Sequence, residues 1–213
     1  SWITKSGDNQ RFMYYIGWNL GVTVPFRNSI GLAVSKNFGT FKKLFNGPII
    51  DRSLNEPHFS ASSCVLIDKN IWKMWYLSCT GWQLHEKIPR HNYHIKYAES
   101  NNGINWIRNG HVAIDYKNDS EYAISRPSVI KDKDLWKMWF SCKGSTYKIS
   151  YAESVDGKNW VRKDDSAGIN VSESGWDSEM IEYPFVFDHK GQRYMLYNGN
   201  NYGESGFGLA LLE

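Results

Sequence analysis

The 213-residue sequence lacks both long apolar runs and clustered charges. No stretch approaches the roughly 18 consecutive apolar residues that a membrane-spanning helix needs. The first residues, SWITKSGDNQ, lack the apolar core of a signal peptide. Lys and Arg together number 25 against 22 Asp and Glu, a net charge of +3, and basic residues never form a run of five. We therefore expect neither a membrane protein nor a nucleic-acid-binding protein.

Cysteine is also scarce. Cys64, Cys79 and Cys142 form no CxxC pair, and each lies beside or within an apolar segment typical of a strand. This pattern favours buried thiols over disulfides or zinc ligands, and we expect neither a metal nor another cofactor. Because thiols persist in reducing compartments, the sequence favours a cytoplasmic location.

Aromatic residues, in contrast, make up 15% of the sequence, with ten Trp and thirteen Tyr. Several of them recur in a repeated unit, of which there are four copies spaced by about 60 residues. The repeat is visible in the segments KYAESNNGINW (96–106), SYAESVDGKNW (150–160), IWKMWYLSCTG (71–81), LWKMWFSCKG (135–144), RFMYYIGWN (11–19) and RYMLYNGN (193–200). Such a period indicates stacked supersecondary units.

The repeated segments have the composition of β-strands. They are rich in Val, Ile, Tyr, Phe and Trp and are bounded by Gly, Asn, Asp or Pro, and no long helix is predicted. In the turn ESxDGxxW, Asp or Asn before Gly tolerates a positive φ, and the Trp can pack over the turn. Repeated four-stranded blades form a β-propeller, so we predict one all-β propeller domain over residues 1–213 with four recognisable blades.

In a propeller blade, the loop between the second and third strands opens on the same face as the segment that leads into the first strand. Trp, Asn, Arg, His and acidic residues are concentrated in these loops, so we expect them to form one ligand-binding mouth. The candidates are Trp18, Asn19, Arg27, Glu56, His58, Trp82, Arg126, Trp176, Asp177, Asn198 and Glu182. The tryptophans could stack against the apolar face of a sugar, or pack as lids between blades.

The segment IEYPFVF (181–187) resembles a motif of the five-bladed β-propeller glycosidases, a group that includes glycoside hydrolase families 32, 43, 68 and 130. In family 32 a Glu-Cys-Pro motif carries the acid/base, and Glu182-Tyr183-Pro184 is similar to it. That family also has an Arg-Asp-Pro motif whose Asp stabilises the transition state. Here the matching segment reads Ser125-Arg126-Pro127, so the carboxylate is missing, which counts against the family mechanism.

The sequence most resembles family 43/32-like proteins linked to bacterial polysaccharide loci, which implies a role in polysaccharide metabolism. The resembling families close their ring with five blades, whereas four are recognisable here. We therefore expect the chain to lack an N-terminal blade, which in those enzymes carries the Asp nucleophile or base.

Glycoside hydrolysis requires two carboxyl groups, one of which protonates the leaving oxygen. Glu182 is the candidate catalytic acid, because its neighbours Ile181 and Tyr183 could raise its pKa. The alternative is a structural salt bridge between Glu182 and Arg126. The second carboxyl group is not identified. Four acidic residues lie on mouth segments, where each also fits a solvated loop charge: Asp51, Glu56, Asp177 and Glu179.

Three functions remain open. The first is an enzyme, a glycoside hydrolase or a phosphorylase, in which Arg27, Arg52, Arg126 and His58 could bind an anionic sugar or a phosphate. The same four side chains could instead satisfy loop carbonyls. The second function is a sugar-binding propeller without catalysis, and the third is a propeller that binds other proteins. A saccharide partner is expected for the first two.

Overall fold

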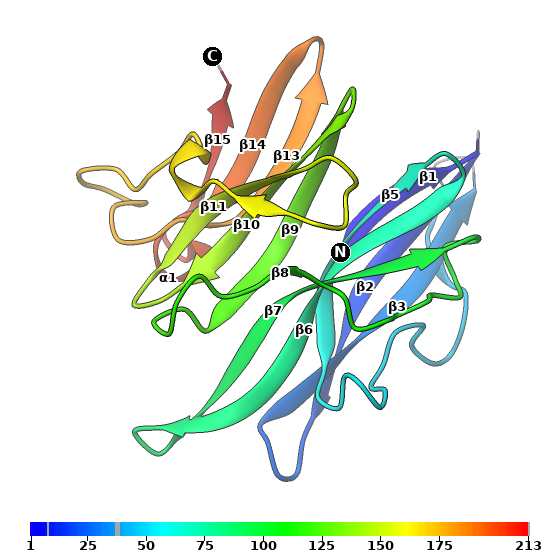
Figure 1. Ribbon diagram of the computed structural model, residues 1–213, viewed down its shortest axis with the longest axis horizontal. Coiled ribbons are helices and arrows are strands. Elements are labelled where there is room, and N and C mark those ends of the chain that lie inside the picture. Colours follow the sequence, from blue (N-terminus) through cyan, green and yellow to red (C-terminus); the bar gives the residue numbers. More distant parts are fainter. Residues whose placement is uncertain (8, 37–38, 213) are drawn as a thin grey trace. The chain divides into compact units, whose positions relative to one another are not determined.

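The computed structural model describes residues 1–7, 9–36 and 39–212, and these form an almost entirely β structure (Figure 1). Helical segments within these residues are limited to a 3-10 turn, η1 (Asp164–Ser166), and a four-residue turn, α1 (Asn200–Gly203). The prediction of an all-β protein without a long helix is confirmed. The chain divides into two compact units, unit 1 over Ser1–Val112 and unit 2 over Ala113–Glu213.

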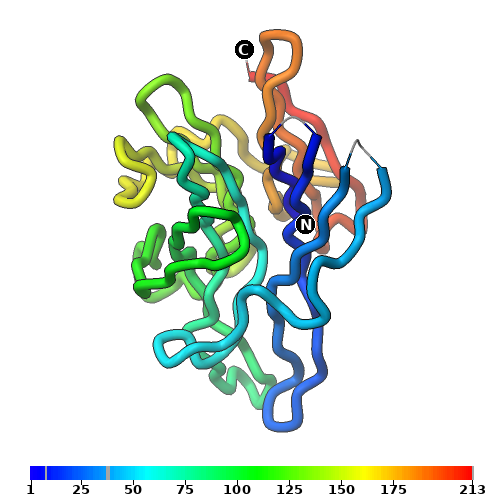
Figure 2. The backbone as a smooth tube through the Cα atoms, turned by 90° about the vertical axis from the view of Figure 1, so that its right-hand side faces the viewer, coloured from blue at the N-terminus to red at the C-terminus, as the bar shows by residue number. Residues whose placement is uncertain are grey.

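Unit 1 is built from two sets of antiparallel strands. In the first set the order is β1-β2-β3-β4, and the long β2–β3 hairpin appears in blue in Figure 2. In the second set β6 pairs with both β5 and β7. The strands are β1 (Trp2–Ser6), β2 (Gln10–Leu20), β3 (Phe26–Lys36), β4 (Lys42–Lys43), β5 (Ser60–Asp68), β6 (Ile71–His85) and β7 (Ile88–Ser100), and β8 (Val112–Ile114) begins where the unit ends.

The core of unit 1 lies between these two sets of strands. Tyr14, Ile30 and Met74 are almost completely buried in it. The Tyr14 hydroxyl donates a hydrogen bond to the carbonyl of Gly103 at 2.9 Å, so the polar end of this buried ring is satisfied.

Unit 2 also contains two sets of antiparallel strands, in the orders β9-β10-β11-β12 and β13-β14-β15. The backbone N–H of Val186 in β13 donates to Ser128 Oγ in β9 (2.8 Å), and that of Tyr183 donates to Ser141 Oγ in β10 (2.7 Å). These bonds fix β13 against the neighbouring sheet. The strands are β9 (Ala123–Asp132), β10 (Leu135–Lys143), β11 (Tyr147–Ser154), β12 (Val161–Arg162), β13 (Glu182–His189), β14 (Gln192–Asn198) and β15 (Phe207–Leu211).

The repeated sequence segments form repeated structure. Trp75 in β6 lies opposite Tyr97, and Trp139 in β10 lies opposite Tyr151. Both tryptophans are buried. The two tryptophans therefore occupy equivalent positions, as the matching segments 71–81 and 135–144 predict.

The repeated turn is also equivalent in the two units. Ser100 Oγ accepts a hydrogen bond from the N–H of Gly103 (3.0 Å), and Ser154 Oγ accepts one from Gly157 (2.8 Å). The glycines have φ values of 71° and 74°, which are strained for any residue with a Cβ. The turn chemistry predicted from the sequence therefore operates in both copies.

A β-bulge occurs at the same step in β5, β9 and β13. In each strand two residues stand where the partner strand has one, and the first of the two has a positive φ. These first bulge residues are Ser62 (44°), Arg126 (52°) and Tyr183 (58°). The residues just before them are Ala61, Ser125 and Glu182.

The three cysteines lie in the cores of their units. Cys64, Cys79 and Cys142 are buried, and burial raises the pKa of the Cys79 and Cys142 thiols to about 12. The prediction of buried thiols is confirmed. None of the described helical segments has the length and apolar character that crossing a lipid bilayer requires.

Candidate functional site

Glu182 is a fully buried acid at the start of β13, with 0% of its surface exposed. Neither of its carboxyl oxygens has a hydrogen-bond partner among the described residues. The sequence-based alternative of a salt bridge to Arg126 is therefore wrong. Burial raises the pKa of Glu182 to about 7, although the charges of Lys143 and Arg126 act to lower it. Such a group holds its proton near neutral pH and can release it, as a general acid must.

Two cations and three tyrosines accompany this acid. Lys143 Nζ donates a hydrogen bond to Tyr202 Oη (2.8 Å) and lies 4.9 Å from the centre of the Tyr147 ring. The Arg126 guanidinium lies 4.8 Å from the centre of the Tyr183 ring, which in turn contacts the Tyr147 ring. We call this set the Glu182 cluster, consisting of Arg126, Lys143, Tyr147, Glu182, Tyr183 and Tyr202.

The cluster forms because strand ends and bulges meet at one edge of unit 2. Lys143 ends β10 and is paired with Tyr147, the first residue of β11. Arg126 and Tyr183 are the first bulge residues of β9 and β13. The sequence-based candidates included Glu182 and Arg126, but missed Lys143 and the tyrosines.

The loop between β14 and β15 supports the cluster. Asn198 lies opposite Glu182 in the strand register, and its Nδ2 donates to the backbone carbonyl of Tyr202 (3.1 Å). Asn200 Oδ1 accepts hydrogen bonds from the N–H groups of Glu179 (2.8 Å) and Met180 (3.1 Å) in the segment before β13. Within unit 2, the loop and the segment leading into β13 therefore meet, and the single mouth shared by all the loops stays a prediction.

Trp176 and Asp177 also lie beside this loop. The Trp176 ring stacks on Tyr197 at 5.5 Å, and a Cβ on Gly199 would come within 2.4 Å of the Trp176 ring. Asp177 is buried and accepts a hydrogen bond from Tyr197 Oη at 2.9 Å. The interpretation of Asp177 as a solvated loop charge is wrong. These contacts give Trp176 a packing role, and its sugar-stacking role stays a prediction.

In unit 1, the candidate aromatic residues form a separate cluster. The Phe26 ring lies 4.7 Å from Trp18, 5.2 Å from Trp82 and 5.3 Å from His91. Phe59, just before β5, packs against Trp82 at 5.9 Å. Trp18 remains 65% exposed, so it is available to stack with a ligand.

Three polar candidates of unit 1 lie near these aromatic residues in the sequence. Asn19 is exposed and lies opposite the half-buried Arg27 in the β2–β3 hairpin. His58 is half-buried, and a Cβ on Gly81 would lie 3.9 Å from its Nε2. Their ligand-binding roles stay predictions.

Glu56 is held in a network of charged and polar groups. It is buried and accepts hydrogen bonds from Tyr76 Oη (2.7 Å) and Arg108 Nη1 (3.0 Å), while Lys96 Nζ lies 3.8 Å away. The interpretation of Glu56 as a solvated loop charge is wrong. Because its oxygens are engaged, the geometry favours a structural role over ligand binding.

Unit 2 repeats this acid–arginine pair. Arg162 donates to both carboxyl oxygens of Glu121, at 2.7 and 2.9 Å, and also to Asp164. Arg162 stands two residues after the Trp of its turn motif, as Arg108 does after its own. This repeated WxR spacing is a signal from which the pair could have been predicted.

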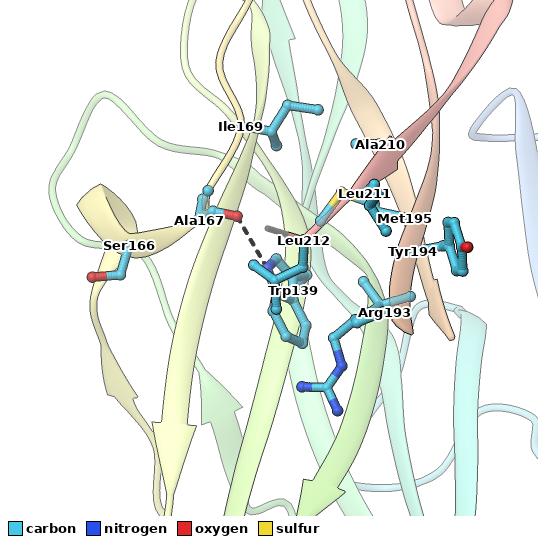
Figure 3. A pocket seen from close by; sticks show the side chains of 12 residues that line it. Trp139, Ser166, Ala167, Ile169, Arg193, Tyr194, Met195, Ala210, Leu211 and Leu212 are labelled. Carbon is cyan, nitrogen blue, oxygen red and sulfur yellow. Dashed lines mark hydrogen bonds between the residues drawn. The ribbon is translucent and has the colours of Figure 1, made fainter. Parts of the chain in front are cut away.

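A hollow in unit 2, lined by residues outside the Glu182 cluster, has a volume of about 370 Å³ (Figure 3). Its lining is mainly apolar and includes Trp139, Ile169 and Met195. Trp139 Nε1 donates to the Ala167 carbonyl at 3.1 Å, as the dashed line in Figure 3 shows. The described residues that line it include no carboxylate, so it does not suit acid catalysis.

No group of three or more His, Cys, Asp or Glu side chains that could hold a metal ion occurs within the described ranges.

Solved structures with a similar fold include several glycoside hydrolases. A structure named as a glycoside hydrolase has a TM-score of 0.76 and 20% identity, and the match covers 98% of this sequence and 64% of the hydrolase. A thermostable family-43 glycoside hydrolase has a TM-score of 0.76 and 18% identity, with coverage of 99% and 70%. The GH32 beta-fructofuranosidase BmSUC1 of Bombyx mori has a TM-score of 0.70 and 14% identity, with coverage of 97% and 45%. This likeness shows a propeller-like glycosidase fold.

Sequence comparison adds nearer relatives. No protein-family model matches the sequence. Two proteins of Mycobacterium tuberculosis, named uncharacterized protein MT1551 and uncharacterized protein Rv1502, are each 42% identical to it over 212 residues, which is 99% of this sequence and 70% of each relative. The protein therefore belongs to the same family as these two mycobacterial proteins.

Proposed function

We propose that the protein is a carbohydrate-active, glycoside hydrolase-like enzyme in which Glu182 donates a proton to the leaving oxygen of a glycoside. The observation that carries this proposal is the fully buried Glu182 carboxyl group, whose oxygens have no partner among the described residues and whose pKa is raised to about 7. Burying an unsatisfied carboxyl group is costly, so its presence is typical of a functional site.

The cluster suits the two states that a general acid must adopt. At neutral pH, burial keeps a proton on much of the Glu182 population, because its pKa is raised. After the proton has moved to the leaving oxygen, the nearby charges of Lys143 and Arg126 stabilise the carboxylate that remains. The tyrosine rings provide amphipathic surfaces against which a sugar ring can pack.

The proposed architecture is four blades of a five-bladed propeller. Its support is the β-bulge shared by β5, β9 and β13 and the turn shared by the two units. The glycosidase structures of similar fold support the same arrangement. In this proposal the saccharide binds at the Glu182 cluster of unit 2. Saccharide contacts of Arg27, His58, Trp18, Asn19 and Trp82 in unit 1 stay predictions from the sequence.

The test is turnover of a panel of aryl glycosides by the wild type and by Glu182→Gln. The amide keeps the shape of the side chain but cannot supply the proton, so turnover should fall by at least about 100-fold. Glu179→Gln is the matched control, because this acid lies on the same segment with an exposed side chain. A Glu182→Gln variant with unchanged kcat would contradict the proposal.

A second function, saccharide binding without turnover, is favoured by one observation. Hydrolysis requires a second carboxyl group, but the other buried acids among the described residues of unit 2, Glu121 and Asp177, are engaged by Arg162 and Tyr197. Calorimetric binding of a saccharide that the wild type never cleaves would establish this second function and exclude the first.

A further inference from the structure

Arg126 differs from the other arginines of unit 2 in having no acidic partner among the described residues. Arg162 is paired with Glu121 and Asp164, and Arg193 is paired with Asp132 and Asp188. Arg126 is only half-buried against solvent, yet its guanidinium makes no hydrogen bond or ion pair with any described residue. It lies instead over the face of the Tyr183 ring. The planar fork of N–H donors that matches an oxyanion is therefore unused.

Lys143 is also without a carboxylate partner in the described part of the protein. Its ammonium group donates a hydrogen bond to the neutral hydroxyl of Tyr202. Burial acts to lower the pKa of Lys143, but the Tyr202 hydrogen bond and the neighbouring tyrosines outweigh it, and the pKa is raised. The ammonium group thus stays charged at neutral pH.

The charges around Glu182 do not balance. The two cations Arg126 and Lys143 both act on one carboxyl group, which holds its proton for part of the time at neutral pH. The hydroxyl of Ser125, the residue just before Arg126, is also buried with no hydrogen-bond partner within residues 1–7, 9–36 and 39–212. Unused donors and an excess of positive charge thus occur together at one edge of unit 2.

We propose that Arg126 and Lys143 bind an oxyanion, a phosphate or a carboxylate, beside the sugar that Glu182 contacts. The inference rests on the proposed function for the saccharide itself and specifies its class as anionic. The oxyanion has two possible sources. It is either a substituent of the saccharide or free phosphate that binds next to a neutral saccharide.

The test measures binding by isothermal titration calorimetry in the Glu182→Gln background, so that turnover does not consume the ligand. The probes are inorganic phosphate, glucose 6-phosphate and glucuronic acid, with glucose as the neutral reference. Charge-assisted hydrogen bonds are roughly twice as strong as neutral ones, so an anionic probe should bind at least about tenfold more tightly than glucose. Binding of inorganic phosphate alone would identify a free anion, and preference for the anionic sugars would identify a substituent.

Variants then assign the binding to the two cations. Arg126→Gln and Lys143→Gln should each weaken binding of the anionic probes by about tenfold or more and leave glucose binding unchanged. Lys148→Gln is the matched control, since this lysine is exposed on β11 of the same unit. Arg126→Lys keeps the charge without the fork and should retain part of the affinity, which separates lost binding from lost folding.

Two results would overturn the inference. One is equal affinity for glucose and for every anionic probe, including no measurable binding of any of them. The other is anion binding that neither Gln variant reduces. Failure of the proposed function gives a different result. A wild type that cleaves no glycoside, but that still binds the anionic probes more tightly than glucose, contradicts the proposed function and leaves this inference intact. Turnover of neutral glycosides by the wild type, together with equal affinity of the Glu182→Gln variant for glucose and for every anionic probe, would contradict this inference alone.

Discussion

Glu182→Gln should stabilise the fold at neutral and alkaline pH. The wild-type carboxyl group ionises in a fully buried position without hydrogen-bond partners among the described residues. In the unfolded chain the same group ionises in water at its ordinary pKa of 4.5, whereas burial raises the pKa to about 7 in the folded state. The folded protein therefore holds the proton more tightly than the unfolded chain.

The size and shape of the effect follow from these two values. Below pH 4.5 the Glu182 carboxyl group is protonated in both the folded and the unfolded state, so its ionisation takes nothing from the free energy of unfolding. Between pH 4.5 and about 7 the wild type loses about 1.4 kcal/mol per pH unit, because the unfolded chain ionises first. The loss levels off above about pH 7 at about 3 kcal/mol. Glutamine does not titrate, so the difference in stability between variant and wild type should grow over this window.

The assay is urea-induced unfolding followed by tryptophan fluorescence at pH values from about 4 to 9. Glu153→Gln is the control, because the pKa of Glu153 shifts in the opposite direction: the hydrogen bond from Lys163 lowers it. Its stability difference from the wild type should stay constant between about pH 5.5 and 8 and shrink only as the pH falls below about 4.5. A Glu182→Gln difference that does not change between about pH 5 and 8 would refute the reasoning.

Two further predictions concern stability alone. Arg162→Met should lower the free energy of unfolding by about 3–5 kcal/mol, because it leaves buried carboxylates without their cationic partner. The control Lys163→Gln changes a side chain that is 49% exposed and should lower the free energy of unfolding by less than about 1 kcal/mol. Similar losses for the two variants in urea unfolding would contradict a larger contribution from the buried pair. Gly110→Ala, at a φ of 74° with no atom within 4 Å, should cost about 1–2 kcal/mol. Gly103→Ala has nearly the same φ but places a Cβ 2.7 Å from the Trp72 ring, so it should cost at least about 1 kcal/mol more, and equal melting temperatures would contradict this.

Local features of the fold were predictable from the sequence. The turn around Gly157 depends on a Ser, an Asp and a Gly within four residues, and its hydrogen bonds to Ser154 and Asp156 are local. The equivalence of Trp75 and Trp139 follows from two nearly identical strand sequences. Both features are set by short-range chemistry, which a repeat makes visible because it occurs twice.

The candidate site was predictable only in part, because its members converge through tertiary structure. Glu182 and Arg126 were found from short motifs, but Lys143, Tyr147 and Tyr202 carry no motif. Their proximity depends on the β10–β11 hairpin and on the loop after β14. Positive φ values at Arg126 and Tyr183 could not be foreseen either, since residues with a Cβ seldom adopt them.

The shared bulge has a consequence for how new chemistry can arise on this backbone. The main chain presents Ala61, Ser125 and Glu182 at the same step of three strands, although their side chains have nothing in common. A reactive group can therefore be gained or lost at any of these steps by changing one residue, while the backbone that displays it stays as it is. Because the strand with its bulge is repeated, the fold offers several equivalent positions for a reactive side chain. An enzyme and a non-catalytic binder of this fold can therefore differ by as little as one or two substitutions.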